Sequence, residues 1–280
     1  MSKIVGVHGI GHQFKGPHSL REEWLPALKD GLAKAQRQLA SDQDFTCAFY
    51  GDLFRPSGKG ASIPPYTANE VTDKWEQDFL LELWREAART DIGLQPPGAN
   101  TKVSVPSVIQ RALNALSHSK FLSGIAERAL IYDLKQVRRY LHEPSVRQMA
   151  RNRVRSAISP ETRVLIAHSL GSVVAYETLC TDPPPQVEVF VTLGSPLGIQ
   201  NLIFHMLDPR PTNGMGMLPP AIKHWVNIAG NGDVVALVKD LSPCFGRTMT
   251  NHLVCNGTHA HDATHYLTTR ELGDAVALGL

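Results

Sequence analysis

The stretch from residue 163 to residue 176 constrains the fold of this chain most strongly. It has the sequence RVLIAHSLGSVVAY, an apolar run that stops at Ser169 and then continues with helical character. Small residues, Ala167 and Gly171, lie two positions to either side of the serine. A sharp strand-to-helix turn leaves room only for small neighbours, so the pattern predicts a buried strand, a strained turn with Ser169 at its apex, and a helix.

A serine in such a turn can act as a nucleophile. The turn projects the hydroxyl clear of the backbone, and the following helix directs its first amides and its positive end toward it. An oxyanion formed at Ser169 would therefore meet the amide of Leu170. The same pattern also fits a serine that only caps a buried helix, because Ala-x-Ser-x-Gly departs from Gly-x-Ser-x-Gly.

Apolar runs and helical periodicity alternate along most of the chain. The expected strands cover residues 4–7, 45–50, 163–168, 187–193, 224–229 and 252–255. Helical spacing follows most of these runs, including a closing helix over 266–278. This order predicts an α/β fold in one domain over 1–280, with a mostly parallel sheet of about six strands and helices on both faces.

Residues 55–145 depart from this alternation. Segments rich in Gly and Pro cover 56–65 and 93–98, and helical spacing covers 69–89 and then 105–141, with a break near 117–120. We therefore expect a helical insertion.

Two interpretations of the insertion are open: an enlarged crossover packed on the sheet, or a mobile cap over an active site. In a cap, an acyl chain would be contacted by apolar residues such as Phe121, Leu122, Ile125, Leu130 and Ile131. Together with the loop over 208–220, the insertion is where we expect specificity to lie.

Charge and hydropathy narrow the possible partners. Lys and Arg number 28 against 26 Asp and Glu, a formal charge of +2 that gives no long-range field for nucleic acid. No apolar run approaches the ~20 residues that span a bilayer. The first residues lack the apolar core of a signal peptide, so we expect a cytoplasmic protein.

The four cysteines lack the spacing of metal ligands, and free thiols are expected. Cys244 and Cys255 are the only pair close enough in sequence to suggest a bridge.

Further polar motifs follow the expected strands. The segment His8-Gly9-Ile10-Gly11 follows the first strand, and its two glycines allow a turn with free amides, as an oxyanion loop requires. It lacks the lysine of a P-loop and the spacing of a dinucleotide fingerprint. An acid and a group of histidines follow later strands, and the carboxyl ends of parallel strands share one edge of a sheet.

These motifs resemble the lipase/esterase branch of the α/β-hydrolase superfamily. The resemblance rests on His8-Gly9-Ile10-Gly11, Ala167-His168-Ser169-Leu170-Gly171, Thr192-Leu193-Gly194-Ser195-Pro196, Trp225-Val226-Asn227 leading to Asp233, and the histidines near the end of the sequence. It covers both ends of the chain but not residues 55–145. It implies the α/β-hydrolase fold and a triad in the chain order serine, acid, histidine.

The resemblance also implies roles for single residues. Ser169 corresponds to the nucleophile, and Ile10 and Leu170 correspond to the donors of the oxyanion amides. The catalytic histidine of similar enzymes lies just before the closing helix, which favours His261. His265 and His259 stay open as alternatives.

Asp233 corresponds to the acid of the triad. The turn at Asn231-Gly232 lets its carboxylate reach back toward the histidine. Of its two competitors, Asp262 fits a helix N-cap and Asp240 fits a solvated charge.

We therefore expect a serine hydrolase that cleaves a carboxylic ester or thioester through an acyl-enzyme, without a metal or an organic cofactor. Its substrate would be a small-molecule or peptide acyl compound. A serine peptidase or an acyltransferase could use the same triad, and a catalytically inactive hydrolase fold could serve as a binding protein. The sequence gives no indication of the oligomeric state.

Overall fold

A single parallel sheet organises the molecule. The structure, a computed structural model, describes residues 2–56, 63–98, 105–119 and 126–280. Six strands form the sheet in the order β2-β1-β3-β4-β5-β6, and every neighbouring pair is parallel. Their bounds are Ile4–Val7 (β1), Phe45–Ala48 (β2), Val164–His168 (β3), Val189–Leu193 (β4), His224–Gly230 (β5) and Thr250–Val254 (β6). The expected parallel sheet of about six strands is confirmed.

The central strands are buried on both faces, which explains why they appear in the sequence as continuous apolar runs. In β3, Val164 and Ile166 belong to the hydrophobic cluster on one face of the sheet. Leu165 and Ala167 belong to the cluster on the other face. Successive side chains of a strand point to opposite faces, so a fully apolar strand needs helices on both sides.

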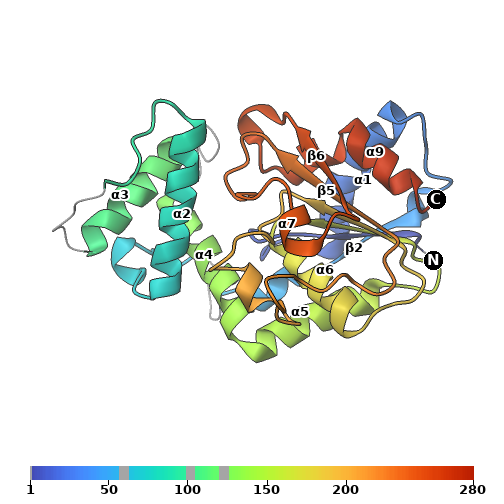
Figure 1. Cartoon of the computed structure of the whole chain (residues 1–280), viewed down its shortest axis with the longest axis horizontal. Coiled ribbons are helices and arrows are strands. Elements are labelled where there is room, and N and C mark those ends of the chain that lie inside the picture. Colours follow the sequence, from blue (N-terminus) through green and yellow to red (C-terminus); the bar gives the residue numbers. More distant parts are fainter. Residues whose placement is uncertain (1, 57–62, 99–104, 120–125) are drawn as a thin grey trace.

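Helices cover both faces of the sheet. Figure 1 shows α1 and α9 on one face and α5 and α6 on the other. The helices that surround the sheet are Pro17–Lys34 (α1), Pro144–Ala157 (α5), Leu170–Thr181 (α6), Ser242–Phe245 (α7), Ala263–Leu267 (α8) and Arg270–Ala277 (α9). Helices on both faces of the sheet were expected, and the structure has them.

The first and last helices pack closely because two glycines meet between them. A Cβ added to Gly31 of α1 would lie 2.1 Å from the carbonyl oxygen of Leu267, and one added to Gly273 of α9 would lie 2.3 Å from the oxygen of Gly31. The closing helix expected over 266–278 is in fact two helices. The second, α9, begins after Thr269, whose hydroxyl accepts a hydrogen bond from the amide of Leu272.

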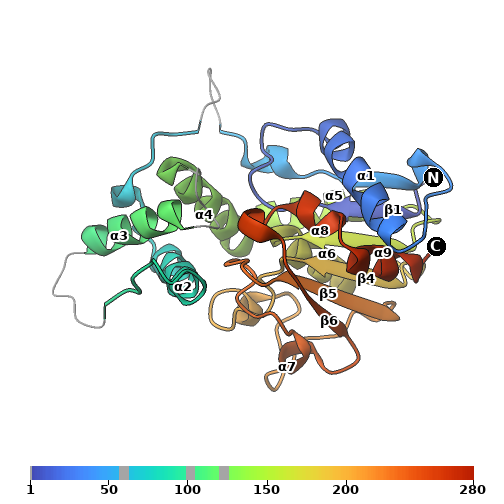
Figure 2. The ribbon, with the colours of Figure 1, turned by 90° about the horizontal axis from the view of Figure 1, so that it is seen from above.

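Three further helices lie beside the sheet (Figures 1 and 2). They are Lys74–Thr90 (α2), Val105–His118 (α3) and Glu127–His142 (α4). The helix expected from residue 69 begins at Lys74 because Asp73 caps it, its carboxylate accepting from the amide of Trp75. The break expected near 117–120 lies between α3 and α4.

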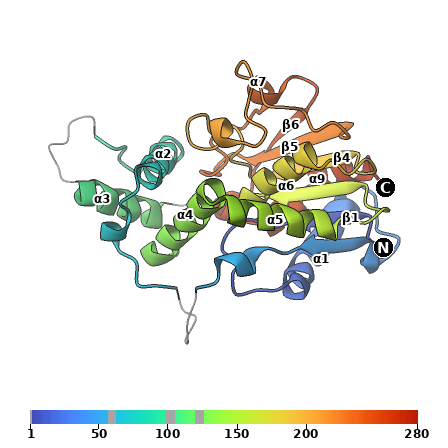
Figure 3. The same ribbon diagram turned by 90° about the horizontal axis from the view of Figure 1, so that it is seen from below.

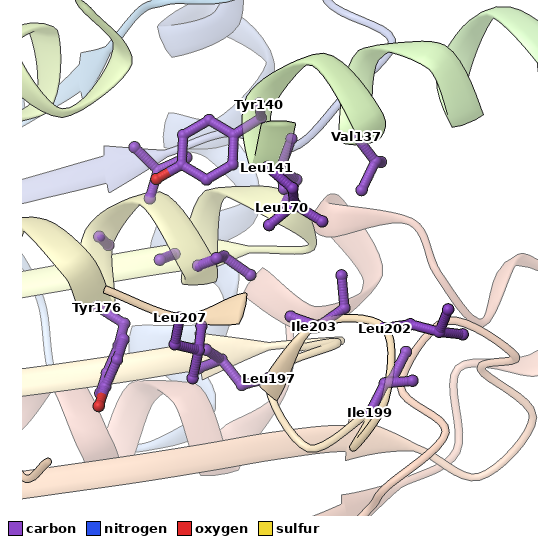
Figure 4. Packing of buried hydrophobic residues seen from close by; sticks show 14 of the residues in the cluster. Val137, Tyr140, Leu141, Leu170, Tyr176, Leu197, Ile199, Leu202, Ile203 and Leu207 are labelled. Carbon is purple, nitrogen blue, oxygen red and sulfur yellow. The ribbon is translucent and has the colours of Figure 1, made fainter. Parts of the chain in front are cut away.

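The apolar face of these helices joins the core on one side of the sheet. Phe79, Leu80 and Trp84 of α2 are buried in the same cluster as strand and α6 residues. The indole of Trp75 donates to the carbonyl of Leu202, which follows β4. Figure 4 shows residues of this cluster from α4, α6 and the chain after β4.

A buried charge connects α4, α5 and α6, which lie together in Figure 3. Glu177 of α6 is fully buried and accepts from the hydroxyl of Tyr140 (2.5 Å) and from Nε of Arg147 (2.8 Å). Because the charge is paired and hydrogen-bonded, its burial is tolerated.

The four cysteines are free, which confirms the expectation of free thiols over a bridge between Cys244 and Cys255. Burial raises the pKa of Cys47 and of Cys180 to about 12, so neither is a thiolate at neutral pH. Within the described ranges, no helix has both the length and the apolar character to cross a membrane.

Candidate active site

Ser169 occupies the turn between β3 and α6 in a strained conformation. Its φ is 54° and its ψ is −131°, a region that residues other than glycine rarely adopt. The turn also needs glycines around it. A Cβ on Gly9 would lie 2.7 Å from Cβ of Ser169, and one on Gly171 would lie 2.3 Å from the carbonyl oxygen of His8. The surrounding backbone therefore fixes the position of the Ser169 hydroxyl.

Ser169, His261 and Asp233 form a continuous hydrogen-bonded row. Nε2 of His261 lies 2.9 Å from Oγ of Ser169, and Nδ1 of His261 lies 2.8 Å from Oδ2 of Asp233. The three residues follow β3, β6 and β5, so parallel strands bring them to one edge of the sheet. An ionised Asp233 only accepts hydrogen bonds, so Nδ1 carries the proton and Nε2 presents its lone pair to the serine.

Asp233 is fully buried, yet four donors surround it. Oδ2 accepts from His261 and from the hydroxyl of Tyr266 (2.6 Å), and Oδ1 accepts from the amides of Val235 (2.9 Å) and Ala236 (3.3 Å). Burial alone would raise the pKa of Asp233, but the charge and hydrogen bond of His261 outweigh it. With the further bonds from Tyr266 and Val235 the pKa falls to about 2. The carboxylate therefore stays ionised at neutral pH.

Gly194, which follows β4, makes room for this row. Its φ is 55°, and a Cβ there would lie 2.6 Å from Oδ2 of Asp233 and 3.1 Å from Nδ1 of His261. Any larger residue would displace one of the two. The neighbouring Ser195 points elsewhere, because its hydroxyl contacts that of Ser172 at 2.7 Å.

His168 holds the backbone of His261 in place through a hydrogen bond. Its Nε2 donates to the backbone carbonyl of His261 at 2.8 Å. Burial, together with the positive charge that His261 carries when protonated, lowers the pKa of His168 to about 3, so its ring is neutral. It therefore acts as a fixed donor that positions the loop after β6.

His8 holds the loop after β1. Its ring stacks on Tyr50 with centroids 4.2 Å apart, its Nδ1 donates to the carbonyl of Gly9 (2.6 Å), and its Nε2 accepts from the amide of Tyr50 (3.2 Å). In a trans peptide the N–H points opposite to the C=O. The amide of Ile10 is therefore directed away from the His8 ring. Within the described chain, neither this amide nor that of Leu170 donates a hydrogen bond.

His265, one of the two alternative histidines, does not join the row. His265 lies within α8, and its Nδ1 contacts the carbonyl oxygen of Asn256 at 3.1 Å. His259 lies in a short turn at Gly257–His259, and only its backbone is described.

The two alternative acids accept hydrogen bonds from backbone amides at the N-termini of helices. Asp262 caps α8, its carboxylate accepting from the amide of Thr264 at 2.8 Å, as its position in the sequence indicated. Asp240 accepts from the amide of Ser242 at the start of α7.

A cavity of about 280 Å³ opens beside Ser169 and His261, and its wall is mostly apolar. The sheet side contributes Ile10, Trp24, Leu170 and Pro196. The helical side contributes Phe79, Leu80 and Leu83 of α2, Leu116 of α3, and Leu130 and Leu134 of α4. The helices of the expected insertion therefore form one wall of the cavity that contains the serine.

Three sequence expectations about this wall have different outcomes. Leu130 lines the cavity, whereas Ile131 is fully buried in the core. Phe121, Leu122 and Ile125 lie outside the described residues. The loop over 208–220 was expected to contribute to specificity, but it supplies no residue to the cavity wall, because its chain packs against α6 and α7 through bonds such as Gly216 to Cys244.

Two polar residues of the site were not predicted from the sequence. Tyr266 lies in α8, after His261, and nothing in the local sequence indicates that its hydroxyl reaches Asp233. Asp133 lines the cavity from α4. It lies three positions after Leu130 and four before Val137, so helical spacing places an acid on an apolar face, and this signal was available.

Among the described residues, no three His, Cys, Asp or Glu side chains are grouped so that they could hold a metal ion. A scan against protein-family models found no match to this chain, and a search of curated proteins found no similar sequence.

Proposed function

We propose that this protein is a serine hydrolase of the α/β-hydrolase fold that cleaves a carboxylic ester or thioester through an acyl-enzyme. The observation that carries the proposal is the hydrogen-bonded row of Ser169, His261 and Asp233, with the serine at a strained strand-to-helix turn. The chain order serine, acid, histidine supports it. The parallel sheet, with these residues after its strands, fits the same fold.

In this mechanism His261 removes the proton from Oγ of Ser169 while the oxygen attacks the acyl carbonyl. Asp233, held ionised by its donors, stabilises the imidazolium. The amides of Ile10 and Leu170 donate to the oxyanion of the tetrahedral intermediate. As the intermediate collapses, Nε2 returns the proton to the leaving alcohol or thiol and the acyl group stays on the serine. A water molecule, activated by His261 in the same way, then releases the acid.

The cavity supports a substrate with an apolar chain. Its wall is mostly aliphatic and aromatic, and its volume of about 280 Å³ suits a small acyl group. We place the helical insertion, over residues 55–145 of a single domain, as a cap that excludes water from the acyl-enzyme.

The test is labelling with a fluorophosphonate probe together with a screen over esters, thioesters and peptide amides. Ser169→Ala should abolish labelling and lower activity by a factor on the order of 10⁴, with little change in thermal stability. Ser195→Ala is the matched control, because this buried serine faces Ser172 instead of the histidine, and it should keep the labelling. Labelling or turnover of the Ser169→Ala protein near the wild-type level would overturn the proposal.

A further inference from the structure

The helical wall of the cavity contains one carboxyl group, that of Asp133. Leu130 and Val137, one turn to either side on α4, are apolar and line the same cavity. A Cβ added to Gly11 would lie 4.0 Å from Oδ1 of Asp133. The carboxyl group therefore lies where α4 meets the loop after β1, the loop that carries the proposed oxyanion amide of Ile10.

One oxygen of this carboxyl group is held and the other is left open. Oδ1 accepts from Nε2 of Gln136 at 3.0 Å, and that amide group also contacts Oε1 of Gln13 at 3.4 Å. Gln136 and Gln13 are both buried, so the hydrogen bond from Gln136 holds the carboxyl group of Asp133 in a fixed position. Oδ2 of Asp133 accepts no hydrogen bond from any residue in the described ranges.

The acid also lacks a Lys or Arg partner. Glu23 and Asp262 line the same cavity, but Glu23 pairs with Lys15 and Asp262 caps α8. No Lys or Arg of the described chain pairs with Asp133, and none lines the cavity. Burial raises the pKa of Asp133 to about 7, although the positive charge that His261 carries when protonated opposes this. A carboxyl group kept in such a wall is costly for stability and is typical of a ligand-binding position.

We infer that Asp133 determines specificity by accepting a hydrogen bond from an ammonium or hydroxyl group on the chain that fills the cavity. The substrates would then be acyl compounds with an amino or hydroxy group beyond an apolar segment. An acyl chain that ends in a carboxylate would be repelled. The reaction on these substrates rests on the proposed function, but the binding of the donor group does not.

Binding is measured first, with the Ser169→Ala protein, so that turnover plays no part. Calorimetric titrations compare n-alkylammonium ions, n-alkanols and n-alkanoates over a series of chain lengths. The ammonium ion should bind best and the alkanoate worst. Adding Asp133→Leu should weaken alkylammonium binding about tenfold or more, whereas Glu127→Gln, which removes an acid elsewhere on α4, should change nothing. Equal affinity for ammonium and carboxylate ligands would overturn the inference.

Turnover is measured next, as the ratio of kcat/KM for amino-terminated and methyl-terminated p-nitrophenyl esters of equal length. In the wild type this ratio should exceed one at some chain length, and Asp133→Leu should invert it. Asp133→Asn retains an oxygen that can accept from Gln136. It replaces the leucine variant in this test if that variant does not fold. A lowered melting temperature with equal loss on both esters would mean a structural role and would overturn the inference.

The two proposals can fail separately. If no ester is hydrolysed by the wild type but the ammonium preference of the Ser169→Ala protein holds, then the proposed reaction fails and the donor site stands. If esters are hydrolysed through Ser169 without any preference between termini, then the donor site fails and the reaction stands.

Discussion

Two carboxyl groups at the site behave in opposite ways: Asp233, behind the cavity on the sheet side, and Asp133, on the helical wall of the cavity. Asp233, on the sheet side, is fully buried and has four donors, and its pKa falls to about 2. Asp133, on the helical side, has one donor and its pKa rises to about 7. Burial alone therefore does not decide the charge of an acid, because the charge of His261 and the hydrogen bonds around Asp233 outweigh it. The buried Asp233 carries a fixed charge, whereas Asp133 on the helical wall leaves one acceptor free for a ligand.

Asp233→Asn tests the buried acid of the row and has the largest expected effect. An amide at this position can turn its NH₂ group toward His261 and hold the wrong tautomer, so turnover of a short ester should fall by about 10⁴. Urea unfolding should show only a small change in stability. Asp262→Asn, which removes only a helix cap, is the control, and a greater loss from this variant would mean that the wrong carboxylate was assigned.

Tyr266→Phe removes one of the four donors and should lower turnover about tenfold and stability by about 1–3 kcal/mol. Loss of the hydroxyl also leaves the amide of Gly230 without its acceptor. The pKa of Asp233 is depressed in the folded state, so its stabilising contribution is present above the unfolded pKa and is lost as pH falls through about 2. The stability difference between variant and wild type should therefore shrink in strong acid.

Tyr132→Phe is the matched control for this variant. It removes a buried hydroxyl that donates to the carbonyl of Phe54, away from Asp233. Its loss of stability should not depend on pH over the same acidic range. If both variants respond alike to acid, then Tyr266 does not act through Asp233.

Neighbouring residues of α4 separate the cavity wall from the core. Leu130→Ala enlarges the cavity, so KM for long-chain esters should rise several-fold relative to short ones, with little loss of stability. Ile131→Ala removes a fully buried side chain and should cost about 2–5 kcal/mol while leaving the preference for chain length unchanged. Equal effects of both variants would show that the helices serve only as core.

The smallest expected effect is the pH dependence of Asp133. The kcat/KM ratio of amino-terminated to methyl-terminated esters should fall a few-fold as pH decreases through about 7, because the protonated acid no longer attracts a cation. The other titratable groups on the cavity wall are His12, Glu23, His168, His261 and Asp262. Asp133→Asn keeps these groups, so the part of the pH dependence that this variant removes is the part that belongs to Asp133.

The sheet was predictable because its strands are buried on both faces. Short, continuous apolar runs such as Val164–His168 are typical of strands covered on both sides, and the small residues around Ser169 favour a tight turn. Helix ends were less predictable, since they depend on single caps. Asp73 and Thr269 both moved a boundary by several residues.

The site was less predictable than the sheet. A polar loop contains no periodicity, so local sequence could not select among His259, His261 and His265 on its own. The role of Asp133 is even harder to predict. Helical spacing shows that Asp133 shares a face of the helix with Leu130, but it does not show which surface that face contacts. Tertiary packing supplies this information, and sequence patterns do not.

The contact of Gly31 with Gly273 has a consequence for the order of folding. It joins α1 to α9, and α8 and α9 follow the loop that holds His261. The serine and its histidine are 92 residues apart, so the row closes only after the final strand has docked and the last helices have returned to the first. During refolding, burial of tryptophan should therefore precede the recovery of any activity at Ser169.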